Sequence, residues 1–220
     1  MRTIEVQQGS DSWHAERARR FTASEAPAVM GASKYLTRSQ LLHQKATGIV
    51  PEVDAAKQRL FDRGHEAEAA ARAIVEDMIG EDLYPATGVH ETDDRLLASM
   101  DGITMLETII FEHKLWSEDL AAQVRSGELE PHYYWQLEAQ LLVSGAEKAI
   151  FVCSDGTREK FVHMEYRPVA GRAAQLLAAW DQFEQDLAAY APPSAAEPAP
   201  TGRAPDSLPA LRIELMGQVT

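Results

Sequence analysis

Apolar and polar positions in the first eighty residues recur mostly at the spacing of amphipathic helices. Ser10 is suited to cap a helix over residues 11–20, whose apolar residue Trp13 would face the core. The stretch Thr22-Ala-Ser-Glu25 reads as a capping box that opens a second, short helix ending near Gly31. Two further helices are predicted, over residues 37–47 before Gly48 and over residues 55–79 before Gly80.

The pattern then changes to short apolar segments separated by turn residues, which is typical of strands. A meander of three strands is predicted over residues 83–90, 96–100 and 107–114, with Asp101-Gly102 as the turn after the second. Two more strands, over residues 149–154 and 159–166, flank Asp155-Gly156, and helices are predicted over residues 117–126, 131–144 and 168–190. This order of elements predicts an α/β (mixed α+β) fold, with one central five-stranded mixed sheet flanked by helices.

Composition divides the chain after Tyr190. Residues 191–210 contain six prolines and six alanines, which predicts an extended, semi-rigid linker. Residues 211–220 begin with the apolar stretch Leu211–Met216 and are expected to form a short docking segment. The function is therefore expected to reside in a single domain, residues 1–190.

Hydrophobic residues make up 45% and charged residues 25% of the 220 residues, which excludes a wholly disordered chain. There is neither an apolar stretch long enough to span a membrane nor an apolar N-terminal signal region, so we expect a cytoplasmic protein without a membrane partner. The lone Cys153 cannot form an intramolecular disulfide, and no Cys/His cluster has the spacing of a zinc site.

The net charge of −13 argues against a surface that coats itself with nucleic acid, but the charge is uneven. Residues 1–65 carry an excess of three positive charges, and the remainder carries an excess of sixteen negative charges. This asymmetry suits a protein that meets an anion in one place and repels it elsewhere. The alternative is that Arg17, Arg19 and Arg20 are solvated residues of a helix.

The candidate chemistry lies between Ser99 and Lys114. On a strand over residues 107–114, the period of two places Glu112 and Lys114 on one face, and Asp101 can approach that face from the neighbouring strand. Two carboxylates and a lysine are suited to metal-assisted cleavage of phosphodiesters. The alternative is a cross-strand Glu–Lys pair on a solvated face, which is common.

Six short motifs in the same order give the chain a resemblance to the phage-recombinase exonucleases typified by phage lambda exonuclease, a branch of the PD-(D/E)xK nuclease superfamily. The motifs are Gln8-Gly-Ser-Asp-Ser-Trp13 with Arg17, Phe21-Thr-Ala-Ser24, Arg63-Gly-His-Glu66, Ser99-Met-Asp101-Gly, Glu112-His-Lys114 and Tyr134-Trp-Gln136-Leu-Glu-Ala-Gln140. Met100 stands where the motif has proline. The resemblance implies a PD-(D/E)xK nuclease core.

The resemblance also implies roles for individual residues. Asp101, Glu112 and the backbone carbonyl of His113 would bind Mg²⁺, two ions per site, with Mn²⁺ as a substitute. Lys114 would stand beside the attacking water, Glu66 would complete the acidic cluster, and Gln136 would lie near the active site, with Tyr133 or Tyr134 along the same wall. A pocket for the 5′-phosphate of the degraded strand would consist of Arg17, Ser24 and Ser99.

The implied function is a 5′→3′ exonuclease acting on ends of double-stranded DNA. It would release mononucleotides and leave 3′ single-stranded tails for a single-strand annealing protein in phage-type recombination. The implied assembly is a homotrimer around a DNA channel. Two alternatives stay open: a nuclease of the same fold that cuts internally or acts on single strands, and a non-catalytic scaffold that binds DNA ends.

Overall fold

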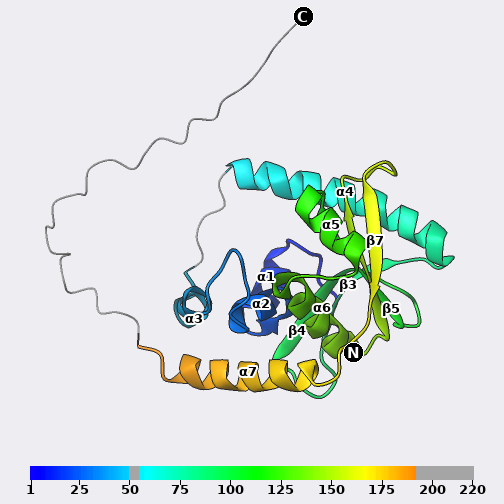
Figure 1. The fold of residues 1–220 in the computed structure, drawn as a ribbon. Helices are drawn as coiled ribbons and strands as arrows, with labels where there is room; N and C mark the ends of the chain where they lie inside the picture. The colour runs from blue at the N-terminus through cyan, green and yellow to red at the C-terminus, as the bar shows by residue number, and fades with distance from the viewer. Residues whose placement is uncertain (50–54, 192–220) are drawn as a thin grey trace, which may run out of the picture.

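The computed structural model describes residues 1–49 and 55–191, with residues 55–62 described by their backbone alone (Figure 1). Residues 192–220 hold almost all of the predicted linker and the whole predicted docking segment, and they lie outside the described residues.

One mixed sheet forms the centre of the fold, with its strands in the spatial order β1-β3-β4-β5-β6-β7. Strand β2 lies off this path and pairs in parallel with β4. The bounds are β1 Arg2–Thr3, β2 Phe21–Thr22, β3 Tyr84–Val89, β4 Leu96–Ile103, β5 Ile109–Leu115, β6 Lys148–Ser154 and β7 Phe161–Tyr166. The five predicted strands are confirmed, and the two-residue strands β1 and β2 add to them.

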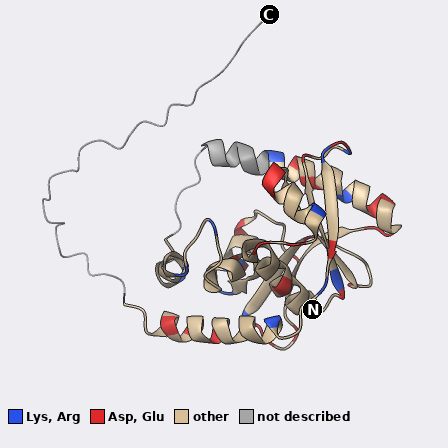
Figure 2. Cartoon of the chain, in the orientation of Figure 1, with Lys and Arg blue, Asp and Glu red and all other residues tan. Residues whose placement is uncertain are grey.

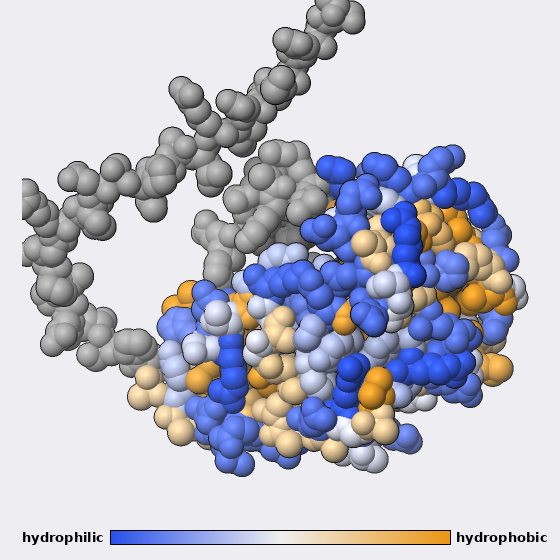
Figure 3. All heavy atoms as spheres, viewed as in Figure 1, coloured by the Kyte–Doolittle hydropathy of each residue, from blue (hydrophilic) through white to orange (hydrophobic). Residues whose placement is uncertain are grey.

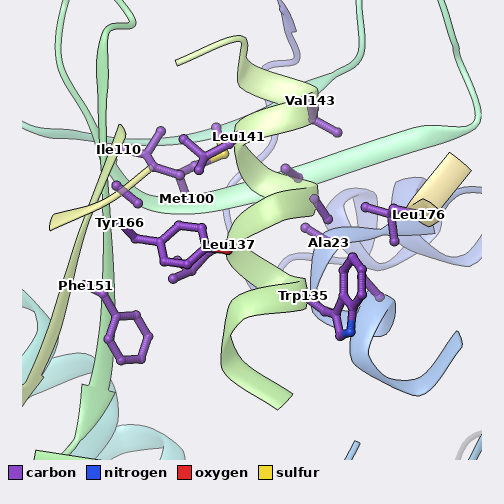
Figure 4. Packing of buried hydrophobic residues seen from close by; sticks show 14 of the residues in the cluster. Ala23, Met100, Ile110, Trp135, Leu137, Leu141, Val143, Phe151, Tyr166 and Leu176 are labelled. Carbon is purple, nitrogen blue, oxygen red and sulfur yellow. The ribbon is translucent and has the colours of Figure 1, made fainter. Parts of the chain in front are cut away.

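Helices cover both faces of the sheet (Figure 1). The bounds are α1 Asp11–Ala18, α2 Ala26–Val29 after a 3-10 turn at Ala23–Glu25, α3 Arg38–Thr47, α4 Ala55–Ile79, α5 Glu118–Ser126, α6 Pro131–Ser144 and α7 Arg172–Ala188. On one face, Ala71 and Val75 of α4 pack against Phe111 and Val152. On the other face, α6 lies between the sheet and the N-terminal helices (Figure 4).

The helix ends follow the predicted local signals. The Ser10 side chain accepts a hydrogen bond from the Trp13 backbone N–H at the start of α1. Thr22 and Glu25 form the predicted capping box. Helix α3 ends at Gly48, whose φ of +72° is the left-handed conformation that glycine adopts readily.

The predicted turn at Asp101-Gly102 is wrong, because both residues lie within β4. The chain reverses further on, after Thr104, where Glu107 adopts a φ of +55°. Glycine is needed at position 102 for a packing reason: a Cβ there would stand 3.0 Å from the Cβ of Leu83 and 3.3 Å from that of Phe111. The Asp-Gly pair therefore marks a close approach within the sheet and does not mark a reversal.

Charged residues of both signs are interspersed along the helices, with acidic residues in α4, α5 and α7 (Figure 2). The face seen in Figure 3 is mostly hydrophilic, with separate small apolar areas. Within residues 1–49 and 55–191, none of the helices has the length and apolar character needed to cross a membrane.

Helix α7 fixes the position of β2 through aromatic packing. The Trp180 ring stacks on Phe21 of β2, with ring centroids 4.7 Å apart and planes 3° apart, and Phe183 meets both rings edge-on. Trp180 is among the largest fully buried side chains. Because β2 leads directly into Ser24, this packing also supports the predicted phosphate pocket.

We predict that Trp180→Ala lowers the free energy of unfolding by about 3–5 kcal/mol, because it removes a fully buried aromatic side chain and leaves a cavity. Urea denaturation followed by circular dichroism measures this loss. Gln185→Ala, at an exposed position of the same helix, is the control and should change the free energy of unfolding by less than about 0.5 kcal/mol. Equal effects of the two substitutions would contradict the packing argument.

Candidate active site

The predicted site lies at a gap along one edge of β4. Strand β3 pairs with β4 along one edge, from Leu97 to Ile103. On the other edge, β5 pairs only with Gly102 and Ile103, and β2 pairs only with Leu96 and Leu97. Residues 98–101 on that edge therefore have no strand beside them.

Asp101 lies at the point where β4 and β5 separate. Its Oδ2 accepts a hydrogen bond of 2.8 Å from the backbone N–H of His113. The carboxylate therefore takes the place of the next backbone hydrogen bond between β4 and β5. Its bond to His113 fixes the spacing of the two strands at this point.

Two side chains from opposite faces of the sheet reach backbone carbonyls of this gap. Gln140 of α6 donates to the Ser99 carbonyl at 3.1 Å, and Arg72 of α4 donates to the Asp101 carbonyl at 2.8 Å. Buried carbonyls need hydrogen-bond partners, and these two side chains supply what a strand would otherwise supply. The Ser99 and Asp101 carbonyls of the gap are thus satisfied by side chains from both faces, and Gln140 Oε1 is buried without a hydrogen-bond partner.

Glu112 is the hub of the site and is almost fully buried. Its Oε1 accepts from Lys114 Nζ and from Gln136 Nε2, both at 2.6 Å, and its Oε2 accepts from Gln140 Nε2 at 2.6 Å. Glu112 and Lys114 share one face of β5, as their spacing predicts. Three donors therefore fix the orientation of one carboxylate.

The charges of the site act strongly on one another. The pKa of Asp101 lies well above its ordinary value because of burial and of repulsion by Glu112 and Glu68, which the attraction of Lys114 only partly offsets. Burial alone would lower the pKa of Lys114, but Glu112 and Asp101 outweigh it and raise that pKa. Lys114 is therefore an ammonium ion in this arrangement.

The imidazole of His113 points away from the carboxylates. Its Nε2 lies 2.9 Å from Ser154 Oγ, and burial lowers the pKa of the ring to about 4. This orientation leaves only the backbone of His113 beside Asp101 and Glu112, and a backbone role is the one that the resemblance implies.

Glu66 does not join this cluster: the structure places it on the exposed side of α4. Glu68 lies there instead, half-buried and paired with Arg72 at 2.5 Å. Burial, together with repulsion by Glu112, raises the pKa of Glu68 against the attraction of Arg72. Two residues along a helix correspond to about 200°, so Glu66 and Glu68 face opposite directions.

The three residues of the predicted phosphate pocket lie within one connected group. Arg17 donates to Ser24 Oγ at 3.0 Å, and its guanidinium carbon lies 4.4 Å from the Trp13 ring centroid. Trp13 Nε1 donates to Ser99 Oγ at 2.9 Å. Trp13 is therefore half-buried beneath Arg17 and does not face the core as expected. Burial lowers the pKa of Arg17, against the opposing effect of Glu25.

Ser99 and Asp101 are two residues apart on β4, a distance of about 7 Å along a strand. Gln140 joins the two areas directly, since its Nε2 contacts both the Ser99 carbonyl and Glu112. The predicted phosphate pocket and the carboxylates are thus neighbours within one site.

Two cavities stand out in the described part of the chain, and neither is lined by Asp101 or Glu112. One, of 160 Å³, lies between α1, α3 and α7, and its basic residues pair with acidic neighbours. The other, of 500 Å³, lies between α6 and the segment from Met30 to Lys34.

The donors at the gap fit a hard divalent cation such as Mg²⁺. Within the described residues, no three histidine, cysteine or carboxylate side chains form a ready-made metal cage. Mg²⁺ is, however, commonly held by one or two carboxylates together with water and substrate phosphate. Burial raises the pKa of Asp101, repulsion by Glu112 and Glu68 adds to this, and a bound cation would favour the charged form of the carboxylate.

A gap in a mixed sheet that holds two carboxylates and a lysine, in this fold, defines the class of the protein: a nuclease of the lambda-exonuclease type. Residues 12–147 match the YqaJ-like viral recombinase domain, and the chain belongs to that family. None of the curated proteins gives a significant sequence match.

Solved structures of exonucleases share the fold. An alkaline exonuclease (LHK-Exo) from Laribacter hongkongensis has a TM-score of 0.68 and 25% identity, over 82% of this chain and 93% of that chain. A structure of LHK-Exo in complex with dAMP gives the same TM-score and coverage at 24% identity. A phage-related exonuclease from Haemophilus somnus 129PT has a TM-score of 0.54 and 11% identity, over 77% of this chain and 95% of that chain.

Sequence reasoning did not assign a role to Glu68, Arg72 or Gln140. The first two form an i, i+4 pair on α4, which is a recognisable signal for a helix face that carries interacting charges. Gln140 lies one turn after Gln136, so both amides point the same way. If the sequence had shown which face of α4 and of α6 meets the sheet, Glu68, Arg72 and Gln140 would have been recognised as candidate site residues.

We predict that Glu68→Gln lowers the rate of DNA cleavage by about tenfold or more, because it removes a charge beside Asp101 and Glu112. Glu66→Gln, two positions away on the exposed side, is the matched control and should leave the rate near that of the wild type. Steady-state digestion of linear duplex DNA measures both. The reverse order of effects would show that Glu66 belongs to the site.

Proposed function

We propose that this protein is a divalent-metal-dependent 5′→3′ exonuclease on linear double-stranded DNA. It releases mononucleotides and leaves 3′ single-stranded tails for phage-type recombination by strand annealing. The observation that carries the proposal is the gap along β4, where Asp101, Glu112 and Lys114 lie beside the group of Arg17, Ser24 and Ser99. The similarity to alkaline exonuclease LHK-Exo supports it.

Asp101, Glu112 and the backbone carbonyl of His113 would hold Mg²⁺, and Glu68 would contribute to a second ion. When bound, the metal lowers the pKa of its water and neutralises charge that develops on the phosphate. Gln136 and Gln140 keep the Glu112 carboxylate in a fixed orientation, which reduces the reorganisation needed during the reaction.

Lys114 acts as a cation in this proposal, because its neighbours raise its pKa above the ordinary value. An ammonium can donate to the attacking water and to a phosphate oxygen, and so orient the first and stabilise charge on the second. It does not serve as the general base while it pairs with Glu112.

Arg17 and Ser24 would bind the 5′-phosphate of the degraded strand, with Ser99 completing the pocket. A guanidinium is planar and always charged, which suits it to phosphate oxygens. The Trp13 ring packs against the Arg17 guanidinium, and its Nε1–H donates to Ser99 Oγ. One residue therefore positions both Arg17 and Ser99. A pocket for a terminal phosphate favours an end-dependent enzyme over one that cuts internally.

We predict that Asp101→Asn, Glu112→Gln and Lys114→Ala each lower cleavage of linear duplex DNA by about 10²-fold or more. The substrate carries labels at either end, so that the order of release gives the direction of digestion. Asp155→Asn, in an exposed turn, is the control for loss of a carboxylate. Removal of the metal by EDTA should abolish cleavage by the wild type.

Release of internal fragments, or cleavage of a closed circular duplex, would favour the endonuclease alternative. Binding of DNA ends without any cleavage would favour the non-catalytic scaffold.

We predict that Arg17→Ala slows digestion of 5′-phosphorylated ends more than digestion of 5′-hydroxyl ends. The guanidinium would contact the terminal phosphate, so its loss matters only where that phosphate exists. Paired digestions of the same duplex with and without the phosphate give the ratio. If both ends slow by the same factor, Arg17 acts only through general electrostatic attraction.

We further propose a homotrimer that holds DNA in a central channel and passes the 3′ tail to a single-strand annealing protein. The argument rests on charge: a chain of net charge −13 repels DNA unless basic groups are confined to one lining. Light scattering should give about three times the 24.3 kDa of one chain. The mass of a single chain would exclude the ring.

A further inference from the structure

An exposed tyrosine stands beside the site in the segment between α2 and α3. Tyr35 has 81% of its surface exposed, the highest fraction among the large apolar and aromatic side chains in the described residues. Among the aromatic rings of the described residues, it meets that of His132 in a T-shaped arrangement, with centroids 5.1 Å apart. A ring held in solvent in this way is accessible to a partner.

Tyr35 belongs to a small cluster of rings and one cation, which we name the Tyr35 cluster: Lys34, Tyr35, His132 and Tyr133. The rings of His132 and Tyr133 meet at 4.9 Å, and Lys34 Nζ lies 5.5 Å from the Tyr133 ring centroid. Lys34 and His132 also line the 500 Å³ cavity between α6 and the segment from Met30 to Lys34. That volume lies within the usual range for a small-molecule pocket.

The cluster adjoins the catalytic groups through α6. His132 and Tyr133 precede Gln136 by four and three residues, which places them on the same side of the helix, one turn nearer its start. Gln136 contacts Glu112 directly. Burial lowers the pKa of His132 and raises that of Tyr133, and the positive charge of Lys114 acts towards a lower pKa on both.

The neighbouring aromatic residues of α6 serve the fold instead. Trp135 is buried, and Tyr134 lies beneath Arg172, whose guanidinium carbon is 3.7 Å from the ring centroid. The cation Arg172 also pairs with the buried Glu138. His132 and Tyr133 at the start of α6 are half-buried, and Tyr133 also packs on Phe151, with ring centroids 5.8 Å apart.

We propose that the Tyr35 cluster is a stacking site for nucleobases of a DNA strand whose phosphate lies at Asp101 and Glu112. Unpaired bases stack on aromatic rings with little preference for sequence. The site makes the enzyme bind a few unpaired nucleotides next to the cleavage point. This inference rests on the proposed function, since it is the phosphodiester chemistry that brings DNA to this surface.

The test measures binding without cleavage. A single-stranded DNA of about eight nucleotides, with a fluorescent label on its 3′ end, is titrated with full-length protein in Ca²⁺ in place of Mg²⁺, and anisotropy gives Kd. Tyr35→Ala should weaken binding on the order of tenfold. Tyr35→Phe keeps the ring and should bind as the wild type does. Tyr84→Ala, which removes an exposed tyrosine of β3, should have no effect.

Salt separates stacking from charge. Between about 50 mM and about 200 mM salt, Kd of each protein should rise, but the ratio of Kd between Tyr35→Ala and wild type should stay constant, because stacking releases no counterions. All substitutions are on the surface, so folding is expected to be unaffected. Thermal unfolding of each variant checks this.

Equal affinity of Tyr35→Ala and wild type, or no binding by the wild type, would overturn the stacking site. So would a variant that changes oligomeric mass but not affinity, since Tyr35 would then be a contact between copies of the chain. If the wild type binds with the expected dependence on Tyr35 and yet cuts no DNA with Mg²⁺, the stacking site stands and the proposed nuclease function fails.

Discussion

The structure depends on a β-ladder that stops early. Had β5 continued to pair with β4 past Gly102, its backbone would occupy the space that the Asp101 carboxylate, Gln140 and Arg72 now fill. A continuous sheet would be simpler to stabilise, but it would leave no space between β4 and β5 for side chains. Because the β4–β5 ladder ends after two pairs, side chains can occupy the space beside β4. Side chains from α4 and α6 supply the hydrogen bonds that the ladder would have made.

The same gap concentrates negative charge in a protein that is already acidic. Glu68, Asp101 and Glu112 stand close together, with Arg72 and Lys114 as their cations. Repulsion of this kind opposes folding, and the surrounding packing offsets it. Glu138 illustrates how: on the far side of α6 from Gln136 and Gln140, it accepts hydrogen bonds from Tyr166 and from the Val169 backbone. That buried network holds the helix in place while its other side approaches the carboxylates.

Features of the chain that follow from local signals could be predicted from sequence, and features that follow from tertiary packing could not. Ser10, Thr22 and Gly48 act within a few residues of themselves, so helix ends follow from them alone. Gly102 looks like a turn residue until the closeness of Leu83 is known. To tell whether Glu66 or Glu68 faces the site, one must know how α4 is rotated about its axis. The apolar pattern of the sequence gives that rotation only roughly, because alanines occur on all sides of this helix. Tyr35 lies in a segment with no periodic pattern, so nothing in the sequence marked it.

The parallel pairing of β2 with β4 has a consequence for the order of folding. Phe21 of β2 pairs with Leu96 of β4, although the two residues are far apart in the sequence. Gln140, which binds Glu112, lies further along the chain than either. Contacts so distant in sequence form late, because closing long loops is entropically unfavourable until the intervening elements are in place. A chain emerging from the ribosome can therefore carry all of its acidic residues and Lys114 and yet lack an organised centre until α6 has docked. Organisation of the centre thus depends on docking of α6, whose Gln136 and Gln140 contact Glu112.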